Sequence, residues 1–132
     1  MIKLFTKKRK GFTLIELIVV IAILGILAAI AVPRLTALRH SSAVSADGAS
    51  ATSLVSACRL QETETGEVVA TLTDLESKYM EVPTPQSGGT FVVSGGGNSP
   101  YVIKWTSTAT GFAAEQTHTE GTKFEPTPTA AP

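Results

Sequence analysis

The sequence has little of the chemistry from which most active sites are built. Its 132 residues include one cysteine, two histidines and one tryptophan. The single cysteine, Cys58, excludes an intramolecular disulfide, so the folded part is held by packing alone or by pairing between subunits. We expect Cys58 to be a small buried apolar residue.

Catalytic and metal-binding motifs are also missing. His40 and His118 have no Cys, Asp or Glu at metal-ligand spacing. Gly95-Gly96-Gly97 lacks the Lys-Ser/Thr pair of a phosphate loop and predicts a hairpin turn instead. No nucleophile elbow is present among the many Ser and Thr residues. The sequence therefore predicts no enzyme, no metal site and no cofactor.

The first eleven residues lack acids, and this divides the chain by charge. Residues 1–11 carry five bases and no acid, whereas residues 12–132 carry six bases and all eleven acids. A basic head before an apolar run is typical of an inner-membrane insertion signal whose basic end stays in the cytoplasm. The net negative remainder argues against nucleic-acid binding through a general basic face, so we predict no direct nucleic-acid partner.

The apolar run is residues 12–32, and Glu16 is its one charged residue. As a helix this run spans about 31 Å, close to the thickness of a bilayer's hydrocarbon core. A charge buried in hydrocarbon costs roughly 2.5–3.5 kcal/mol on insertion scales. Glu16 therefore needs a partner, and the nearest plausible one is a positive charge on another molecule in the same membrane.

Three interpretations of this run compete. It is an ordinary transmembrane anchor, a secretory signal, or a helix that stays on the protein after a short basic leader is removed. Ala29-Ile30-Ala31 fits the small-x-small pattern of signal cleavage, which would release a soluble exported binding domain after Ala31. Against this, the apolar stretch is too long and contains Glu16.

The run Gly11-Phe12-Thr13-Leu14-Ile15-Glu16, followed by residues 17–32 and Pro33, resembles the N-terminus of type IV pilins and the related pseudopilins. The resemblance covers about residues 7–40. It implies residues 1–11 as a cleaved leader and residues 12–33 as a transmembrane helix that later forms the filament core.

The resemblance implies a sequence of steps at named residues. A prepilin peptidase would cut between Gly11 and Phe12, and the new amine on Phe12 would be methylated. The Glu16 carboxylate would neutralise the N-terminal amine of an adjacent subunit. Filaments of similar pilins lose helical order between the residues that match Gly25 and Pro33, so we expect the same here; a simple kink at Pro33 is the alternative.

Residues 34–64 predict the amphipathic half of the same helix. An apolar stripe faces one side, Gly48 is expected to weaken the helix by up to about 1 kcal/mol relative to Ala, and Thr65-Gly66 signals the stop. A helix over residues 12–64 is roughly 80 Å long, too long for a domain of this size to bury, which indicates a polymer. The predicted stripe is Leu35, Leu38, Val44, Ala51, Leu54, Val55 and Cys58, and the charged residues expected mostly off it are Arg34, Arg39, Asp47, Arg59 and Glu62.

Residues 65–124 predict a globular head. We expect a short helix centred on residues 74–80 and an antiparallel meander with strands at 90–94, 101–106 and 111–117. The fold class is then α+β, with the long N-terminal helix packed at its outer half against a small antiparallel sheet. The Pro/Thr-rich residues 125–132 are expected to be extended or disordered, and Glu62, Glu64 and Glu67 are expected to form a solvated helix end.

The resemblance to type IV pilins implies a structural subunit of an extracellular type IV pilus that serves adhesion, twitching motility or DNA uptake. Its partners would be other copies of itself, the prepilin peptidase, the pilus assembly platform and motor, and the cytoplasmic membrane before assembly. A pseudopilin of a type II secretion-like system is the alternative within the resemblance. The chain lacks both a C-terminal cysteine pair and an acidic C-terminal calcium loop, which favours the pilin interpretation.

Overall fold

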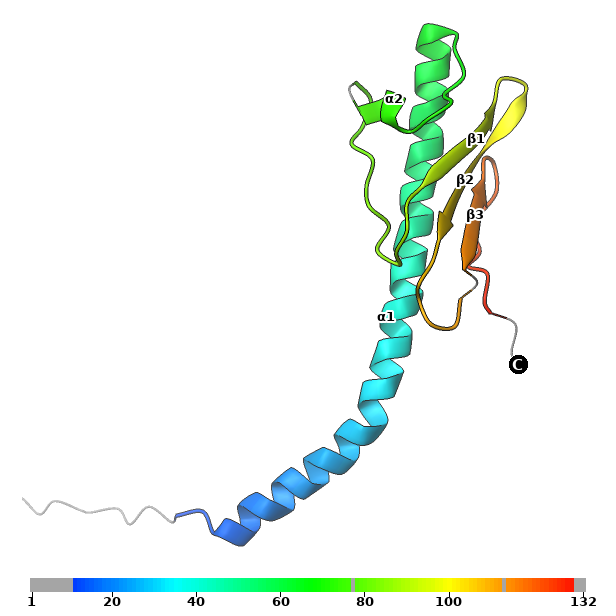
Figure 1. Ribbon diagram of the computed structural model, residues 1–132. Helices are drawn as coiled ribbons and strands as arrows, with labels where there is room; N and C mark the ends of the chain where they lie inside the picture. The colour runs from blue at the N-terminus through cyan, green and yellow to red at the C-terminus, as the bar shows by residue number, and fades with distance from the viewer. Residues whose placement is uncertain (1–10, 77, 113, 130–132) are drawn as a thin grey trace, which may run out of the picture. The chain divides into compact units, whose positions relative to one another are not determined.

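The structure, a computed structural model, describes residues 11–76, 78–112 and 114–129, and the chain forms two compact units, one ending at Leu35 and one beginning at Thr36. The three strands form one antiparallel sheet in the order β1-β2-β3, so the predicted α+β class is confirmed. In chain order (Figure 1) the elements are α1 (Leu14–Thr65), α2 (Thr73–Glu76), β1 (Val92–Gly96), β2 (Ser99–Thr106) and β3 (Glu115–Thr119).

Helix α1 begins and ends within two residues of its predicted bounds. It stops at Gly66, whose φ of 75° is left-handed and whose N–H donates to the Glu62 carbonyl at 2.8 Å. Glycine is favoured there because a side chain would strain this conformation. Residues 25–33, with Gly25 and Pro33, are helical in the single chain. The expected loss of helical order concerns a filament and stays a prediction.

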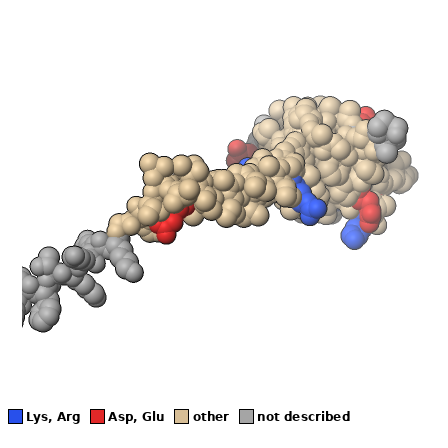
Figure 2. Space-filling model, turned by 90° about the horizontal axis from the view of Figure 1, so that it is seen from below, with Lys and Arg blue, Asp and Glu red and all other residues tan. Residues whose placement is uncertain are grey.

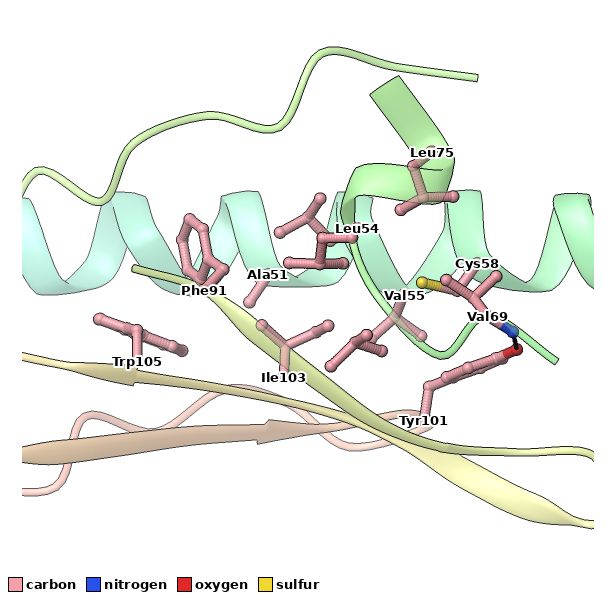
Figure 3. Close-up of a cluster of buried hydrophobic side chains, with 12 residues drawn as sticks. Ala51, Leu54, Val55, Cys58, Val69, Leu75, Phe91, Tyr101, Ile103 and Trp105 are labelled. Atoms are coloured by element: carbon pink, nitrogen blue, oxygen red, sulfur yellow. Dashed lines mark hydrogen bonds between the residues drawn. The ribbon is translucent and has the colours of Figure 1, made fainter. Parts of the chain in front are cut away.

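The core of the second unit lies between α1 and the inner face of the sheet. Figure 3 shows Leu54 and Val55 of α1 facing Ile103 of β2, with Leu75 of α2 closing one side. Cys58 is fully buried, as predicted. The buried α1 positions recur every three or four residues, which is one helical face: Val44, Asp47, Gly48, Ala51, Leu54, Val55 and Cys58.

The predicted apolar stripe of α1 differs from the buried face in two ways: some of its residues are exposed, and one acid expected off it is buried. Leu35 and Leu38, expected on it, are 51% and 67% exposed, because the buried face of α1 begins only at Val44. Asp47, expected off it, is 1% exposed. Its carboxylate accepts hydrogen bonds from the backbone N–H groups of Gln86 and Ser87, at 2.6 and 2.8 Å, and from the Ser87 hydroxyl. These donors replace water, so the acid can be buried.

Gly48 was expected to be a weak point in the helix, but it has a packing role. A Cβ atom at this position would overlap the ring of Phe124. The missing side chain lets that ring lie against α1, with its centroid 5.2 Å from the ring of Trp105. Gly48 has low helix propensity, but its small size leaves room for the ring of Phe124 to pack on the core.

The hairpin between β1 and β2 turns at Gly97 and Asn98, as the glycine run predicted, and Gly97 has a φ of 64°. The third strand differs from its prediction. It begins at Glu115, and Phe112 forms an isolated bridge with Pro128 instead. Gly111, with a φ of 90°, interrupts the extended run there.

The expectation of a solvated helix end is wrong at Glu62, whereas residues 125–129 take the extended form, one of the two that were expected. Glu62 is half-buried, lies 2.8 Å from the Arg59 guanidinium and accepts the Gly97 N–H at 2.8 Å, so it does not belong to a solvated helix end. Within residues 125–129, the Thr127 and Thr129 N–H groups donate to the Gln116 side chain and the Gly111 carbonyl. This part is extended and hydrogen-bonded, whereas residues 130–132 lie outside the described residues.

Candidate functional site

The candidate site lies at the start of α1, on a segment that buries almost nothing. Every residue from 11 to 39 is exposed. An 18-residue window of α1 has a mean hydropathy of 3.0 and none of it is buried, so by length and composition the helix is able to cross a membrane. In Figure 2 the narrow part of the surface has a single acidic patch, and Glu16 is the one acid of residues 11–35.

Glu16 is bound within its own chain by the residue that caps the helix. Its Oε2 atom accepts the Thr13 backbone N–H at 2.9 Å and the Thr13 hydroxyl at 2.8 Å. In return the Thr13 hydroxyl oxygen lies 3.3 Å from the Glu16 N–H. This reciprocal pair is a capping box, in which two amide donors at the helix start are satisfied at once.

Sequence reasoning missed this role, although Thr13-Leu14-Ile15-Glu16 has the Thr-x-x-Glu spacing that announces it. The capping donors are neutral and leave the carboxylate charged. Oε1 has no hydrogen bond or ion pair in the part of the chain that the structure describes. The carboxylate is therefore oriented by one oxygen and open to a cation through the other.

A shallow groove of about 400 Å³ runs beside the Glu16 side chain. The groove residues that belong to α1 fall on one helical face because they recur at three or four positions, and Phe12 lies just before the helix. Their side chains are apolar apart from one carboxylate, so the groove suits a cation carried by an apolar chain. The residues are Phe12, Ile15, Glu16, Val19 and Val20.

The other predicted site residues lie apart from the groove or at its rim. Gly11 and Phe12 precede α1 and are exposed, Phe12 by 86%, so the bond between them is accessible. Gly25 and Pro33 lie further along α1, and no described side chain lies within 4 Å of a Cβ at Gly25. Among the described residues, no group of three or more His, Cys, Asp and Glu could hold a metal ion.

Comparison with known proteins adds a match over the same segment. A family model of the prokaryotic N-terminal methylation motif matches residues 6–32. The matched residues include Gly11, Phe12 and the capping pair of Thr13 and Glu16, so the motif coincides with the groove.

Two fimbrial proteins of Pseudomonas aeruginosa are each 38% identical to this chain over 73 residues, or 55% of it. That match covers 47% of each relative, so the chain spans about half the length of the curated relatives it matches. No solved structure matches the chain. These matches confirm the resemblance to type IV pilins and pseudopilins, which is a likeness to structural proteins and not to enzymes.

Proposed function

We propose that this chain is a structural pilin subunit that polymerises through α1 into an extracellular type IV pilus. It is made as a prepilin, and a prepilin peptidase cuts between Gly11 and Phe12. The Phe12 amine is then methylated. Residues 12–33 hold the subunit in the cytoplasmic membrane as a single span until the assembly platform and motor extract it.

The observation that carries this proposal is the state of Glu16. An acid whose second oxygen has no partner among the described residues lies in a groove on a helix face that none of those residues covers. An unpaired charge in hydrocarbon costs roughly 2.5–3.5 kcal/mol on insertion scales. A cation from another molecule offsets this cost, because a paired buried charge is far less unfavourable than a lone one.

The amine of Phe12 on a second subunit has the chemistry that the groove requires. Methylation keeps its positive charge, and the Phe12 ring supplies apolar surface beside it. A pair between one subunit's amine and the next subunit's Glu16 also sets the register, because a misplaced subunit leaves two charges unmatched. The contact is heterologous and does not close, so it propagates into a filament.

The test separates the charge of Glu16 from its capping role. We expect Glu16→Ala to insert and be cleaved but to form no surface filaments. Thr13→Ala removes the capping hydroxyl and leaves the carboxylate, so its filaments should persist. Glu67→Ala, the loss of an exposed acid in the second unit, is the matched control. Mass spectrometry of the N-terminus measures cleavage, and electron microscopy of sheared surface material measures filaments.

Normal filament yield from Glu16→Ala would refute the proposed pairing. Equal loss from Thr13→Ala and Glu16→Ala would assign Glu16 to helix capping alone. N-terminal sequencing addresses the rival class: a methylated Phe12 supports a pilin, whereas a start at Val32 supports a soluble exported domain. Long surface filaments distinguish the pilus from the short pseudopilus of a secretion system. Adhesion, twitching motility and DNA uptake are the uses of such a filament that we expect.

A further inference from the structure

The last described part of the chain, residues 121–129, lies against the sheet and is named here the C-terminal strap. A side chain of β3, and not the backbone of a neighbouring strand, binds its backbone at Thr127. The Gln116 amide oxygen accepts the Thr127 N–H at 2.9 Å, and the Gln116 amide N–H donates to the Thr127 carbonyl at 3.1 Å. The Thr129 N–H donates to the Gly111 carbonyl at 3.0 Å.

One aromatic side chain anchors the strap to the core. The ring of Phe124 lies over Gly48 of α1, 5.2 Å from the ring of Trp105 and 6.4 Å from the ring of His118. Phe124 is half-buried, so it is seated on the core and is not enclosed by it. Among the described residues the strap is fixed by few contacts: the Gln116 amide pair, the Thr129 backbone bond, the Phe124 ring, and the bonds from the Thr122 N–H and hydroxyl to the Thr119 carbonyl.

His118 lies beneath this ring in an environment that suits only its neutral form. The residue is 3% exposed. Its Nε2 atom lies 3.4 Å from the Thr52 hydroxyl oxygen, whose own proton is donated to the Gly48 carbonyl at 2.9 Å. The Thr52 oxygen can then only accept, which assigns the imidazole proton to Nε2. Nδ1 is buried and has no hydrogen-bond partner in the described chain.

Protonation would place a second N–H and a positive charge at Nδ1, where no acceptor meets them. Burial lowers the pKa of His118 from its ordinary value of 6.5. None of the described hydrogen bonds or ion pairs brings an acid to Nδ1, and the described charged groups nearest in the surrounding elements pair with other groups. On α1, Asp47 binds Gln86 and Ser87, and Arg59 binds Glu120 of the β3 end; on β2, Lys104 pairs with Glu115; on the strap, Lys123 pairs with Glu125.

We propose that His118 and the C-terminal strap form an acid-released latch, in which protonation of His118 lifts Phe124 and the strap from the sheet. Water then reaches Nδ1 and solvates the charge, which the closed strap does not permit. The packing of α1 on β2 stays in place. Leu54, Val55 and Ile103 belong to the main core, whereas Phe124 only packs against it from outside. Release exposes Trp105 and the outer edge of β3.

The sign of the effect follows from the direction of the pKa change. When the strap is released, His118 binds the proton at the ordinary pKa of a histidine. When the strap is closed, His118 binds the proton only at lower pH. The latch is therefore fully closed above about pH 6.5, and closure weakens as the pH falls below that value.

Trp105 makes this measurable, because it is the only tryptophan of the chain and lies beside Phe124. The full chain in detergent micelles is titrated from about pH 8 to about pH 5, above the range in which exposed carboxylates titrate. We expect the Trp105 emission to change with a midpoint below 6.5. The protection of the Thr127 amide against exchange should fall by roughly tenfold or more, while the helical circular-dichroism signal is retained.

Three variants decide the assignment. His118→Gln keeps an amide donor without a titrating ring and should abolish the transition, whereas His40→Gln changes the other histidine and should leave it intact. Phe124→Ala weakens the closed strap and should move the midpoint upward, toward the ordinary histidine value. An unchanged transition in His118→Gln, its loss in His40→Gln, or no emission change in the parent chain would overturn the proposal. None of these readouts depends on filament formation.

Discussion

Gly48→Ala is a substitution for which helix propensity and tertiary packing predict opposite signs. Alanine in place of glycine inside a helix stabilises it by about 1 kcal/mol. The added Cβ, however, overlaps the ring of Phe124. Either the ring leaves its seat or the strap moves with it, so we expect Gly48→Ala to destabilise the second unit.

The magnitude follows from what Phe124 loses. Full burial of a phenylalanine side chain is worth roughly 1.5–3 kcal/mol, and a paired ring contact adds about 0.5–1.5 kcal/mol. Phe124 is half-buried and makes its closest ring contact with Trp105. Ejecting it therefore costs about 1–3 kcal/mol, against the gain of about 1 kcal/mol from propensity. The expected net effect is a loss of up to about 2 kcal/mol.

A double-mutant cycle with Phe124→Ala isolates the clash. Once the ring is gone, Gly48→Ala should stabilise the protein by up to about 1 kcal/mol, as in an ordinary exposed helix. Urea unfolding of the full chain in detergent, followed by Trp105 fluorescence and circular dichroism, gives both free energies of unfolding. If Gly48→Ala stabilises the parent chain as much as it stabilises Phe124→Ala, the packing role of Gly48 is wrong.

Other substitutions and conditions test separate parts of the second unit. Asp47→Ala should lower the free energy of unfolding by roughly 1–3 kcal/mol, because the amides of the Gln86 and Ser87 segment lose their acceptor; an unchanged urea midpoint would contradict this. The Arg59 guanidinium and the Tyr101 N–H hold the pKa of Glu120 below its usual value of 4.5. Stability from this pair is present above pH 4.5 and is lost as the pH falls through the lowered pKa, so Arg59→Gln should flatten the acid limb of unfolding measured against pH. Burial raises the pKa of the Cys58 thiol to about 11, so labelling at neutral pH should be slow until urea unfolds the chain; fast native labelling would count against its burial.

The long helix and the methylation motif could be predicted from the sequence because both are local properties. The apolar run and the stop at Gly66 depend on residues close together in the chain. The hairpin at Gly97 is equally local, since a left-handed φ favours glycine whatever packs around it. The capping box of Thr13 and Glu16 was just as local, and was missed only because the glutamate was interpreted as a charge in need of a cation.

The errors concern residues whose partners are distant in the chain. Asp47 looked like a solvent-facing acid, because nothing near it in the sequence announces two amide donors forty residues later. The residues around Phe112 predict a strand there, but Phe112 forms an isolated bridge with Pro128. The composition of residues 125–129 predicts an extended segment, but it does not announce that the Gln116 side chain binds their backbone.

By itself the sequence determined the apolar helix, its acid and its likeness to the methylation motif, since hydrophobicity, charge and backbone propensity act over a few residues. Only the tertiary structure decided which helix face is covered, why a glycine at position 48 is needed, and where His118 and the strap meet. The physical reason is that burial and hydrogen-bond satisfaction are properties of the assembled surroundings of a side chain, which the order of residues along the chain does not specify.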